Sequence, residues 1–360
     1  MLKIKYWFPI LILLLCAGCA GAAKSRGSSQ GAGSQGEPSR AEPAWVSDAD
    51  QVYSRLRYMA AVGYGPSRAA AEKEAFASMV SVFGQTVQVD RQSMVDYSEA
   101  LRQDTVSSYI RNTEISNAIK TSSEVEILIG AEIRDYWYDG RGTHYAVAVM
   151  EKSKAAALYA ELVDANREII GALTAMDEGE KYSFSGYARC LLAAKVAGGN
   201  RVFAGILSVV GGPALGAGEL AQEEQFRLEA LDIARNIPLD LRVENDRNNR
   251  IRGAFAAVIG AKGFLSGGGD SPYTLDARLE FTPVDLPGQE NSYVRYVLDA
   301  GLTDTRTGTV LLPYTISGRE GHLTEVEAEN RALRAIEQQI ARGWEAAFSA
   351  YLDSLSAGKR

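Results

Sequence analysis

The sequence is poor in the two residue types that most often bind metals or take part in nucleophilic catalysis. It has three cysteines and two histidines among 360 residues. The histidines, His144 and His322, have no partner at a metal-ligand spacing such as HxxxH or CxxC. No phosphate-binding P-loop motif occurs either. We therefore expect a protein that is not an enzyme and holds no metal or cofactor, with histidines that are solvated or cap other groups.

Positive charge is also scarce. Lys and Arg number 38 against 45 Asp and Glu, which leaves a formal net charge of −7. Nucleic acid or an anionic lipid surface would require a basic face on its partner. The charge balance therefore argues against nucleic acid as a partner, and no motif identifies a small-molecule substrate.

Long apolar runs are absent after residue 18. The stretch 202–218 comes closest, but it is short and broken by Gly211, Gly212 and Pro213. A transmembrane helix needs roughly 20 apolar residues. We expect no membrane-spanning helix in the mature chain.

The N-terminus has the three parts of a secretory signal peptide. Lys3 and Lys5 give a positive region, residues 7–15 are apolar, and residues 17–18 are a small Ala-Gly pair. The apolar part is too short to span a bilayer comfortably. We predict a signal peptide over residues 1–18.

Cys19 directly follows this signal, and the segment LCAGC at 15–19 resembles a bacterial lipobox. Cys16 stands where leucine is usual, and it is a poor lipid acceptor because bulky Leu15 precedes it. The alternative is an ordinary cleaved signal followed by a chance cysteine. We predict that Cys19 is the lipid attachment site (palmitate among the acyl chains), and each buried CH₂ would contribute ~0.8 kcal/mol to membrane anchoring.

Residues 19–42 predict a disordered tether between the membrane and the folded body. Gly, Ser, Ala and Gln dominate, and no large apolar residue occurs. Such a stretch cannot bury enough surface to offset the entropy of ordering it. Ala20 after Cys19 weakly favours the outer membrane, facing the periplasm or the cell surface, because no Asp there signals inner-membrane retention.

Cys190 is the only thiol left once Cys16 has been removed and Cys19 has been lipidated. The mature chain therefore forms no internal disulfide. Cys190 lies in an apolar helical run, YARCLLAA. We expect a small buried hydrophobic side chain and no reactive thiol, since no base or electropositive setting is evident.

The patterns along the folded part predict an α+β protein with two antiparallel-sheet and helix domains joined by a helical connector. We expect an α+β domain over 43–150, the connector over 151–237 and a C-terminal α+β domain over 238–360. In the first domain the expected strands are 58–65, 86–90, 125–133 and 144–150, with helices at 67–83 and 105–120 and a hairpin turn at 138–142.

In the rest of the chain the pattern is first helical, and then apolar and polar residues alternate again as in strands. Helices are expected at 152–176, 182–197 and 219–237, with a Gly-rich apolar segment at 200–218. Strands follow at 239–243, 275–281, 294–302 and 310–316, with helices reaching 261 and over 322–355. The order β-α-β-β-β-α predicts one sheet with helices on one face.

Four motifs in residues 43–150 occur in the order typical of one lipoprotein family. They are the opening Pro-Ala-Trp at 43–45, the aromatic stretch 58–65 ending in VGYG, the Ala-rich helix from 69, and Tyr-Trp at 136–137 followed by HYAV at 144–147. The segment resembles the LPP-twenty family of bacterial lipoproteins. The resemblance implies a lipid-anchored envelope protein, with relatives that include flagellar outer-membrane proteins, and it implies no catalytic residues. Residues 238–355 resemble periplasmic envelope-assembly lipoprotein domains more loosely.

Several other patterns have a functional and a plainer interpretation. The glycine-rich 266–270 is either a phosphate loop or an ordinary loop, and 245–249 is either a calcium loop or a turn before a helix. Asp135 and Asp139 flank aromatic residues, as in sugar-binding sites or in an ordinary hairpin. The aromatic side chains are either core residues or interface anchors; they are Trp45, Tyr136, Trp137, Tyr138 and Trp344.

Two functions remain open from the sequence, with an enzyme whose site is unrecognised as a third. The first is a non-enzymatic, lipid-anchored envelope scaffold or assembly component with an envelope protein as its partner. Its candidate locations are the flagellum and the outer membrane. The second is a lipoprotein that binds peptidoglycan or another glycan through an aromatic patch.

Overall fold

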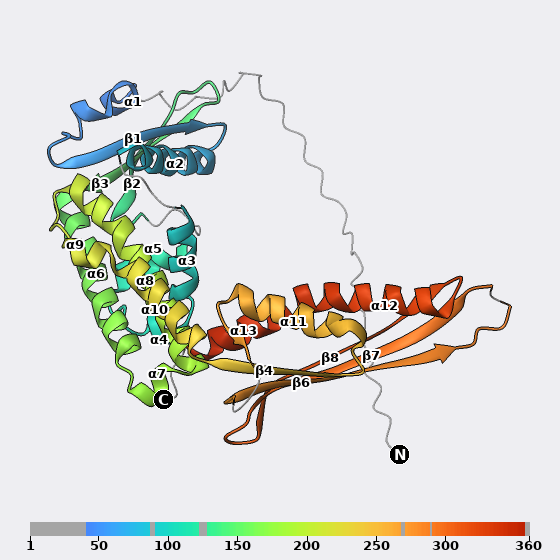
Figure 1. Ribbon diagram of the computed structural model, residues 1–360. Helices are drawn as coiled ribbons and strands as arrows, with labels where there is room; N and C mark the ends of the chain where they lie inside the picture. The colour runs from blue at the N-terminus through green and yellow to red at the C-terminus, as the bar shows by residue number, and fades with distance from the viewer. Residues whose placement is uncertain (1–40, 87–90, 122–127, 268–270, 289, 357–360) are drawn as a thin grey trace, which may run out of the picture. The chain divides into compact units, whose positions relative to one another are not determined.

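The computed structural model describes residues 41–86, 91–121, 128–267, 271–288 and 290–356 (Figure 1). The signal peptide, Cys19 and almost all of the tether lie outside the described residues. Residues 87–90, which make up most of the strand predicted over 86–90, also lie outside them. So do residues 125–127, the start of the strand predicted over 125–133. These predictions therefore stay predictions.

Three antiparallel strands form the N-terminal sheet, in the order β1-β3-β2. They are β1 (Tyr58–Gly65), β2 (Ala131–Tyr138) and β3 (His144–Glu151). Helix α2 (Arg68–Thr86) covers one face (Figure 1), and its approach depends on Gly63, where a Cβ would overlap the backbone of Ala75. Trp45, in the short helix α1 (Ala44–Ser47), packs on the other face.

The middle of the chain is helical. Its helices are α3 (Arg91–Leu101), α4 (Asp104–Ser107), α5 (Thr113–Thr121), α6 (Lys152–Thr174), α7 (Glu178–Lys181), α8 (Phe184–Val210), α9 (Ala217–Leu220) and α10 (Gln222–Arg235). Helices α3, α6 and α10 all pack against α8. The Ser183 hydroxyl accepts a hydrogen bond from the Gly186 N–H and caps the start of α8.

Five strands form the second sheet, in the order β5-β4-β6-β7-β8. They are β4 (Pro238–Glu244), β5 (Leu265–Ser266), β6 (Tyr273–Val284), β7 (Ser292–Asp304) and β8 (Thr309–His322). Helices α11 (Arg250–Ala261), α12 (Glu325–Gln339) and α13 (Glu345–Leu355) lie on one face of it (Figure 1). A π-helical turn, Ile340–Trp344, joins α12 to α13.

The predicted α+β class, with helices on one face of the C-terminal sheet, is confirmed. One detail differs, because the second sheet is mixed: β4 runs parallel to both β5 and β6. Helix α11 crosses over between β4 and the following strands, and such a crossover returns the chain in the same direction. The strands β6, β7 and β8 form the expected antiparallel meander.

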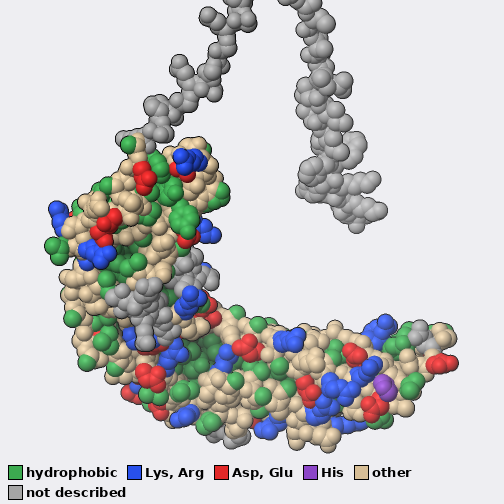
Figure 2. Space-filling model, turned by 90° about the horizontal axis from the view of Figure 1, so that it is seen from above, with side chains coloured by type: hydrophobic (Ala, Val, Ile, Leu, Met, Phe, Trp, Pro, Cys, Tyr) green, Lys and Arg blue, Asp and Glu red, His purple; other side chains and the backbone are tan. Residues whose placement is uncertain are grey.

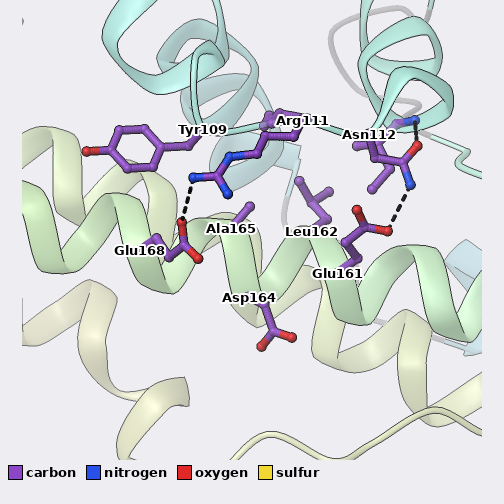
Figure 3. Close-up of a pocket in the computed structure, with 10 residues that line it drawn as sticks. Tyr109, Arg111, Asn112, Glu161, Leu162, Asp164, Ala165 and Glu168 are labelled. Atoms are coloured by element: carbon purple, nitrogen blue, oxygen red, sulfur yellow. Dashed lines mark hydrogen bonds and ion pairs between the residues drawn. The ribbon is translucent and has the colours of Figure 1, made fainter.

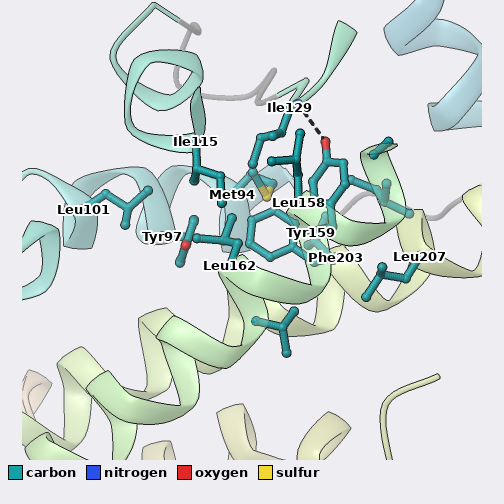
Figure 4. Close-up of a cluster of buried hydrophobic side chains, with 14 of the residues drawn as sticks. Met94, Tyr97, Leu101, Ile115, Ile129, Leu158, Tyr159, Leu162, Phe203 and Leu207 are labelled. Atoms are coloured by element: carbon teal, nitrogen blue, oxygen red, sulfur yellow. Dashed lines mark hydrogen bonds between the residues drawn. The ribbon is translucent and has the colours of Figure 1, made fainter. Parts of the chain in front are cut away.

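Helix α8 contributes to both hydrophobic cores. Its first turns, with Phe184 and Cys190, belong to the cluster under the C-terminal sheet. From Leu192 to Val210 it belongs to the cluster that contains the N-terminal sheet, α3 and α6 (Figure 4). The buried residues of the middle helices are thus divided between two cores. The proposed domain boundaries at 150 and 237 stay predictions.

The predicted end of this helix near residue 197 is wrong, because α8 continues through the Gly-rich segment to Val210. Glycine is used there for close packing within a helix. A Cβ at Gly199 would overlap the ring of Tyr97, which is fully buried and lies edge-on to Phe203 with ring centroids 5.2 Å apart. At Gly198 it would lie 3.1 Å from the carboxylate carbon of Glu223.

Among the described residues α8 is also the one helix that is long and apolar enough to cross a membrane. Of its most apolar window, 72% is buried inside the protein. A helix that is apolar on all sides is expected where neighbouring helices surround it. We therefore assign α8 as a core helix, in line with the expectation from the sequence.

Three further expectations need correction. In the described part of the strand expected over 125–133, the strand begins at Ala131, after Gly130 with a left-handed φ of 81°. The helix expected over 105–120 is two helices, because the Asn112 side chain accepts the N–H of Glu114 at 2.9 Å and starts α5 anew. His322 ends strand β8 and does not start the last helix, which Thr324 caps.

Two open edges of the C-terminal sheet, along the end of β6 and along β8, carry a proline. Strand β6 continues beyond Arg278, the residue paired with the last residue of β4, and Pro283 lies in this unaccompanied part. Strand β8 pairs with no described strand other than β7, and Pro313 lies in its first half. Because proline has no N–H to offer to a further strand, it discourages pairing at a sheet edge.

The contact between Gly199 and Tyr97 leads to a prediction on stability. Gly199→Ala should lower the free energy of unfolding by about 1–3 kcal/mol, the usual range for overpacking a core. Gly253→Ala in α11 is the matched control, since no atom lies within 4 Å of the added Cβ. It should raise stability by up to about 1 kcal/mol through helix propensity. Urea unfolding of both variants checks this, and equal effects at the two sites would contradict it.

Candidate functional site

The hairpin β2–β3 carries most of the aromatic residues that the sequence singled out, and its two faces hold different ones. Tyr136 and Tyr138 lie opposite Ala146 and His144, on the face covered by α2. Trp137 lies opposite Tyr145, on the face covered by α1. A bulge between Ile133 and Asp135 shifts the register and sets these directions.

His144 is held among aromatic side chains. Its Nδ1 shares a hydrogen bond with the Tyr136 hydroxyl, and its ring lies 4.6 Å from that of Tyr138. The Arg68 guanidinium lies 5.0 Å from the centre of the Tyr136 ring. No group of three His, Cys, Asp or Glu side chains suited to a metal occurs in the described part of the chain.

The two carboxylates of this hairpin are used within the hairpin and do not face a common ligand. Asp135 accepts the indole N–H of Trp45 at 3.0 Å. Asp139 accepts the backbone N–H groups of Arg141 and Thr143 at 2.6 and 3.0 Å. These backbone donors lower the pKa of Asp139 below its usual range, because they stabilise the carboxylate. The structure thus favours the ordinary hairpin over the carboxylate pair of a sugar site.

The Asn-rich segment 245–249 is a turn with a helix cap. The carboxylate of Asp246 accepts the N–H groups of Ile251 at 3.2 Å and Arg252 at 2.8 Å, at the start of α11. This bonding uses Asp246 and favours the plainer interpretation over a calcium loop. The glycine-rich 266–270 lies partly outside the described residues.

Cys190 is fully buried in the core around α8. Burial, aided by the negative charge of Glu229, raises the pKa of its thiol to about 11. A thiol with a raised pKa is a poor nucleophile at neutral pH. The structure thus shows the buried cysteine expected from the sequence.

The aromatic residues divide into core and surface sets. Trp45 and Trp344 are 3% and 0% exposed and belong to the core. Trp137 is half-buried and Tyr138 exposed. The sequence analysis did not single out Tyr64, which is 67% exposed and lies opposite Tyr145 across the β1–β3 pair.

Tyr64, Tyr145 and Trp137 form one row across the three strands, which we call the aromatic row. The ring centroids of Tyr64 and Tyr145 are 6.4 Å apart, and those of Tyr145 and Trp137 are 5.2 Å apart. The planes in both pairs are inclined by 41°. Strand register brings these residues together, since 81 residues of sequence separate the first two.

The second surface feature is the free edge of β1. Among the described strands β1 pairs only with β3, and a hollow of about 410 Å³ lies beside its first half. Met59 and Ala61 of β1 and Met79 and Val82 of α2 line the hollow on one side. The charged residues Asp50, Arg55 and Lys152 lie at its rim. We call this feature the β1 groove.

A smaller hollow of about 140 Å³ lies between the α4–α5 loop and α6 (Figure 3). Its polar side chains already bond one another. Asn112 donates to Glu161 at 2.8 Å, and Arg111 lies 3.8 Å from the carboxylate of Glu168. These interactions join the loop to α6 and leave little for a ligand.

Comparison with known proteins assigns the part of the chain that carries both surface features. Residues 43–151 match the family model described as LPP20 lipoprotein. This segment is thus similar to LPP20 lipoproteins. The match confirms the resemblance inferred from the four motifs, and a lipoprotein domain implies association with the cell envelope.

Two solved structures show the extent of the likeness. The secreted protein HP1454 of Helicobacter pylori is similar over 79% of this chain and 98% of its own, at 13% identity and a TM-score of 0.40. A minor lipoprotein of Acinetobacter baumannii is similar over 31% of this chain and 93% of its own, at 15% identity and a TM-score of 0.25. No curated protein sequence matches the chain.

The buried thiol predicts a loss of stability at alkaline pH. The pKa of Cys190 is about 11 in the folded protein, against 9.0 for an ordinary thiol. The unfolded chain therefore releases this proton first, so the contribution of this thiol to stability should be constant below about pH 9 and be lost as the pH rises toward 11. Urea midpoints across this range check the prediction. Cys190→Ala should have a shallower decline, and an identical decline would contradict the role of Cys190.

Proposed function

We propose that this protein is a lipid-anchored, non-enzymatic assembly component of the cell envelope. In this proposal Cys19 carries the lipid in the outer membrane, and the LPP20-type domain binds an extended segment of another envelope protein. The observation that carries the proposal is the free edge of β1 with the β1 groove beside it. A strand edge of this kind offers backbone hydrogen bonds to an added strand.

The backbone groups of β1 alternate between β3 and the free edge. The Arg57 carbonyl accepts the Lys152 N–H at 2.9 Å on the β3 side, whereas the Tyr58 N–H donates to the Ser54 carbonyl at 2.9 Å. By the alternation of antiparallel strands, Ala60 and Val62 then direct their N–H and C=O groups away from β3. An incoming strand would bond to these two residues.

Strand β1 has none of the features that discourage pairing at an edge. Its sequence, YMAAVGYG, holds no proline and no charge, whereas Pro283 and Pro313 interrupt the free edges of the other sheet. Proteins that must avoid added strands place proline or charge at such positions. The contrast within one chain supports a binding role for the β1 edge.

The β1 groove would take the side chains of the added strand. Alternate side chains of a strand point to one face, so every second residue of the partner would lie over Met59, Ala61 and Met79. This apolar lining suits a segment with small or medium apolar residues at alternate positions. Lys152 and the Asp50–Arg55 ion pair at the rim suit polar residues at its end.

Replacing one edge residue by proline tests the proposal. Ala60→Pro removes an N–H that faces the free edge, so the free energy of unfolding should change by less than about 1 kcal/mol. Ala61→Pro is the comparison, because its N–H faces β3, and it should cost on the order of 1–3 kcal/mol. Chemical denaturation measures both.

Partner binding is then read in intact cells with a photo-crosslinking residue at Val62 and, as a control, at the exposed Leu228 of α10. We expect a discrete adduct with one envelope protein from position 62 alone, lost when Ala60→Pro is added. Mass spectrometry of the adduct should locate the crosslink in an extended segment. The absence of an adduct, or adducts with a second copy only, would contradict a partner at this edge.

The anchor itself leads to a separate prediction. Cys19→Ser should abolish lipid attachment, because the thioether to the lipid requires the cysteine sulfur. We expect the protein to leave the membrane fraction, and intact mass spectrometry of the wild type should show the acyl chains. A variant that stays in the outer-membrane fraction after a high-salt wash would argue against Cys19 as the anchor.

A further inference from the structure

The aromatic row lies at the hairpin end of the N-terminal sheet, next to the area covered by α1. Trp45 packs on Val147 and Val149, one and two rows further along the same face. The row itself extends beyond this cover, since Tyr64 is 67% exposed and Tyr145 and Trp137 are half-buried. The sheet therefore presents ring surface to the solvent at one end.

The rings are held in place before any ligand binds. Tyr145 on the central strand contacts both neighbours, at centroid distances of 6.4 and 5.2 Å. Each ring also belongs to a strand that is paired with a neighbouring strand along the length of the sheet. A binding surface built this way pays little entropy when it orders a ligand.

The chemistry of the row suits a chain of sugar rings. The axial C–H groups of a β-linked pyranose form an apolar face that stacks on an aromatic ring. Successive rings of an extended β-1,4-linked glycan follow one line, as the three aromatic residues do. The hydroxyl groups of Tyr64 and Tyr145 can donate hydrogen bonds to sugar hydroxyls and accept hydrogen bonds from them.

We propose that Tyr64, Tyr145 and Trp137 form a stacking site for a β-1,4-linked N-acetylhexosamine glycan, the backbone of peptidoglycan. The choice of this glycan rests on the proposed envelope location. The site itself rests on the row. It lies at the other end of β1 from the β1 groove, so that one domain would contact both the cell wall and a protein partner.

Charge favours a neutral sugar chain over an anionic polymer. The chain carries a net charge of −7, and acidic and basic side chains are interspersed on the face shown in Figure 2. No residue of the row is charged, and the nearby Asp135 is bonded to Trp45. Anionic glycans or nucleic acid would need a positive field that the row lacks.

The predicted tether allows this contact. Its 24 residues, 19–42, would span at most roughly 80 Å when fully extended, and its Gly/Ser-rich composition predicts an r.m.s. end-to-end distance of about 25–30 Å. A protein anchored at Cys19 would thus reach polymer tens of ångströms from the membrane.

Tryptophan fluorescence gives a direct readout. The mature chain has three tryptophans, of which Trp45 and Trp344 are buried, so Trp137 alone reaches the surface. Titrating the mature chain in detergent with chitin oligosaccharides should shift or quench its emission in a saturable way. Dextran, an α-linked glucan, is the control polymer and should have no effect.

Variants then test the site. Tyr64→Ala should weaken the apparent affinity for chitin oligosaccharides by about tenfold, and Trp137→Ala should abolish cosedimentation with purified sacculi. Tyr182→Ala is the matched control, since Tyr182 is an exposed tyrosine (38%) outside the row. Thermal melts of each variant verify folding, and Trp137→Phe should retain part of the binding if stacking is its role.

Three outcomes would overturn the proposal. The first is that the wild type shows neither a fluorescence change nor cosedimentation with sacculi. The second is that the Tyr64→Ala and Tyr182→Ala variants bind the glycan equally well. The third is that substitutions in the aromatic row weaken binding of a protein partner but not of the glycan. Ala60→Pro should leave glycan binding unchanged. A failure of the protein-docking proposal is thereby separated from a failure of this one.

Discussion

The packing of Tyr97 against Gly199 is the contact on which much of the helical body depends. It brings α3 onto α8 in the middle of the first core, and Phe203 and Tyr159 close the cluster around it (Figure 4). The Tyr97 hydroxyl donates to Asn166, whose amide donates to Asn200, so a polar chain crosses the same core. Since the first turns of α8 also belong to the second core, a shift of this helix would affect both sheets.

Local patterns predicted the elements whose stability is local. Strand β1 has the bounds expected from its sequence, and the helix expected from residue 67 is present as α2, with the Ser67 hydroxyl accepting the Ala70 N–H. The end of α8 could not be predicted, because Gly198 and Gly199 look like helix breakers until Tyr97 and Glu223 fill the space beside them. Helix propensity depends on the local sequence alone, whereas these glycines are required by side chains that are distant in the sequence.

The candidate surfaces show the same limit. The hairpin aromatics were visible in the sequence, but nothing local distinguished Trp137 on one face from Tyr136 on the other, since the β-bulge near Arg134 decides the faces. Tyr64 joins the row only through strand register. The free edge of β1 likewise appears only once the strand order β1-β3-β2 is known.

The prolines at the edges of the C-terminal sheet matter most for a protein held on a membrane. An anchor confines many copies to a thin layer, where they collide far more often than in the bulk fluid. An unguarded 14-residue strand such as β8 would then seed sheets that grow from molecule to molecule. Pro283 and Pro313 limit such pairing along β6 and β8, whereas β1 has no proline and leaves its edge open to an added strand.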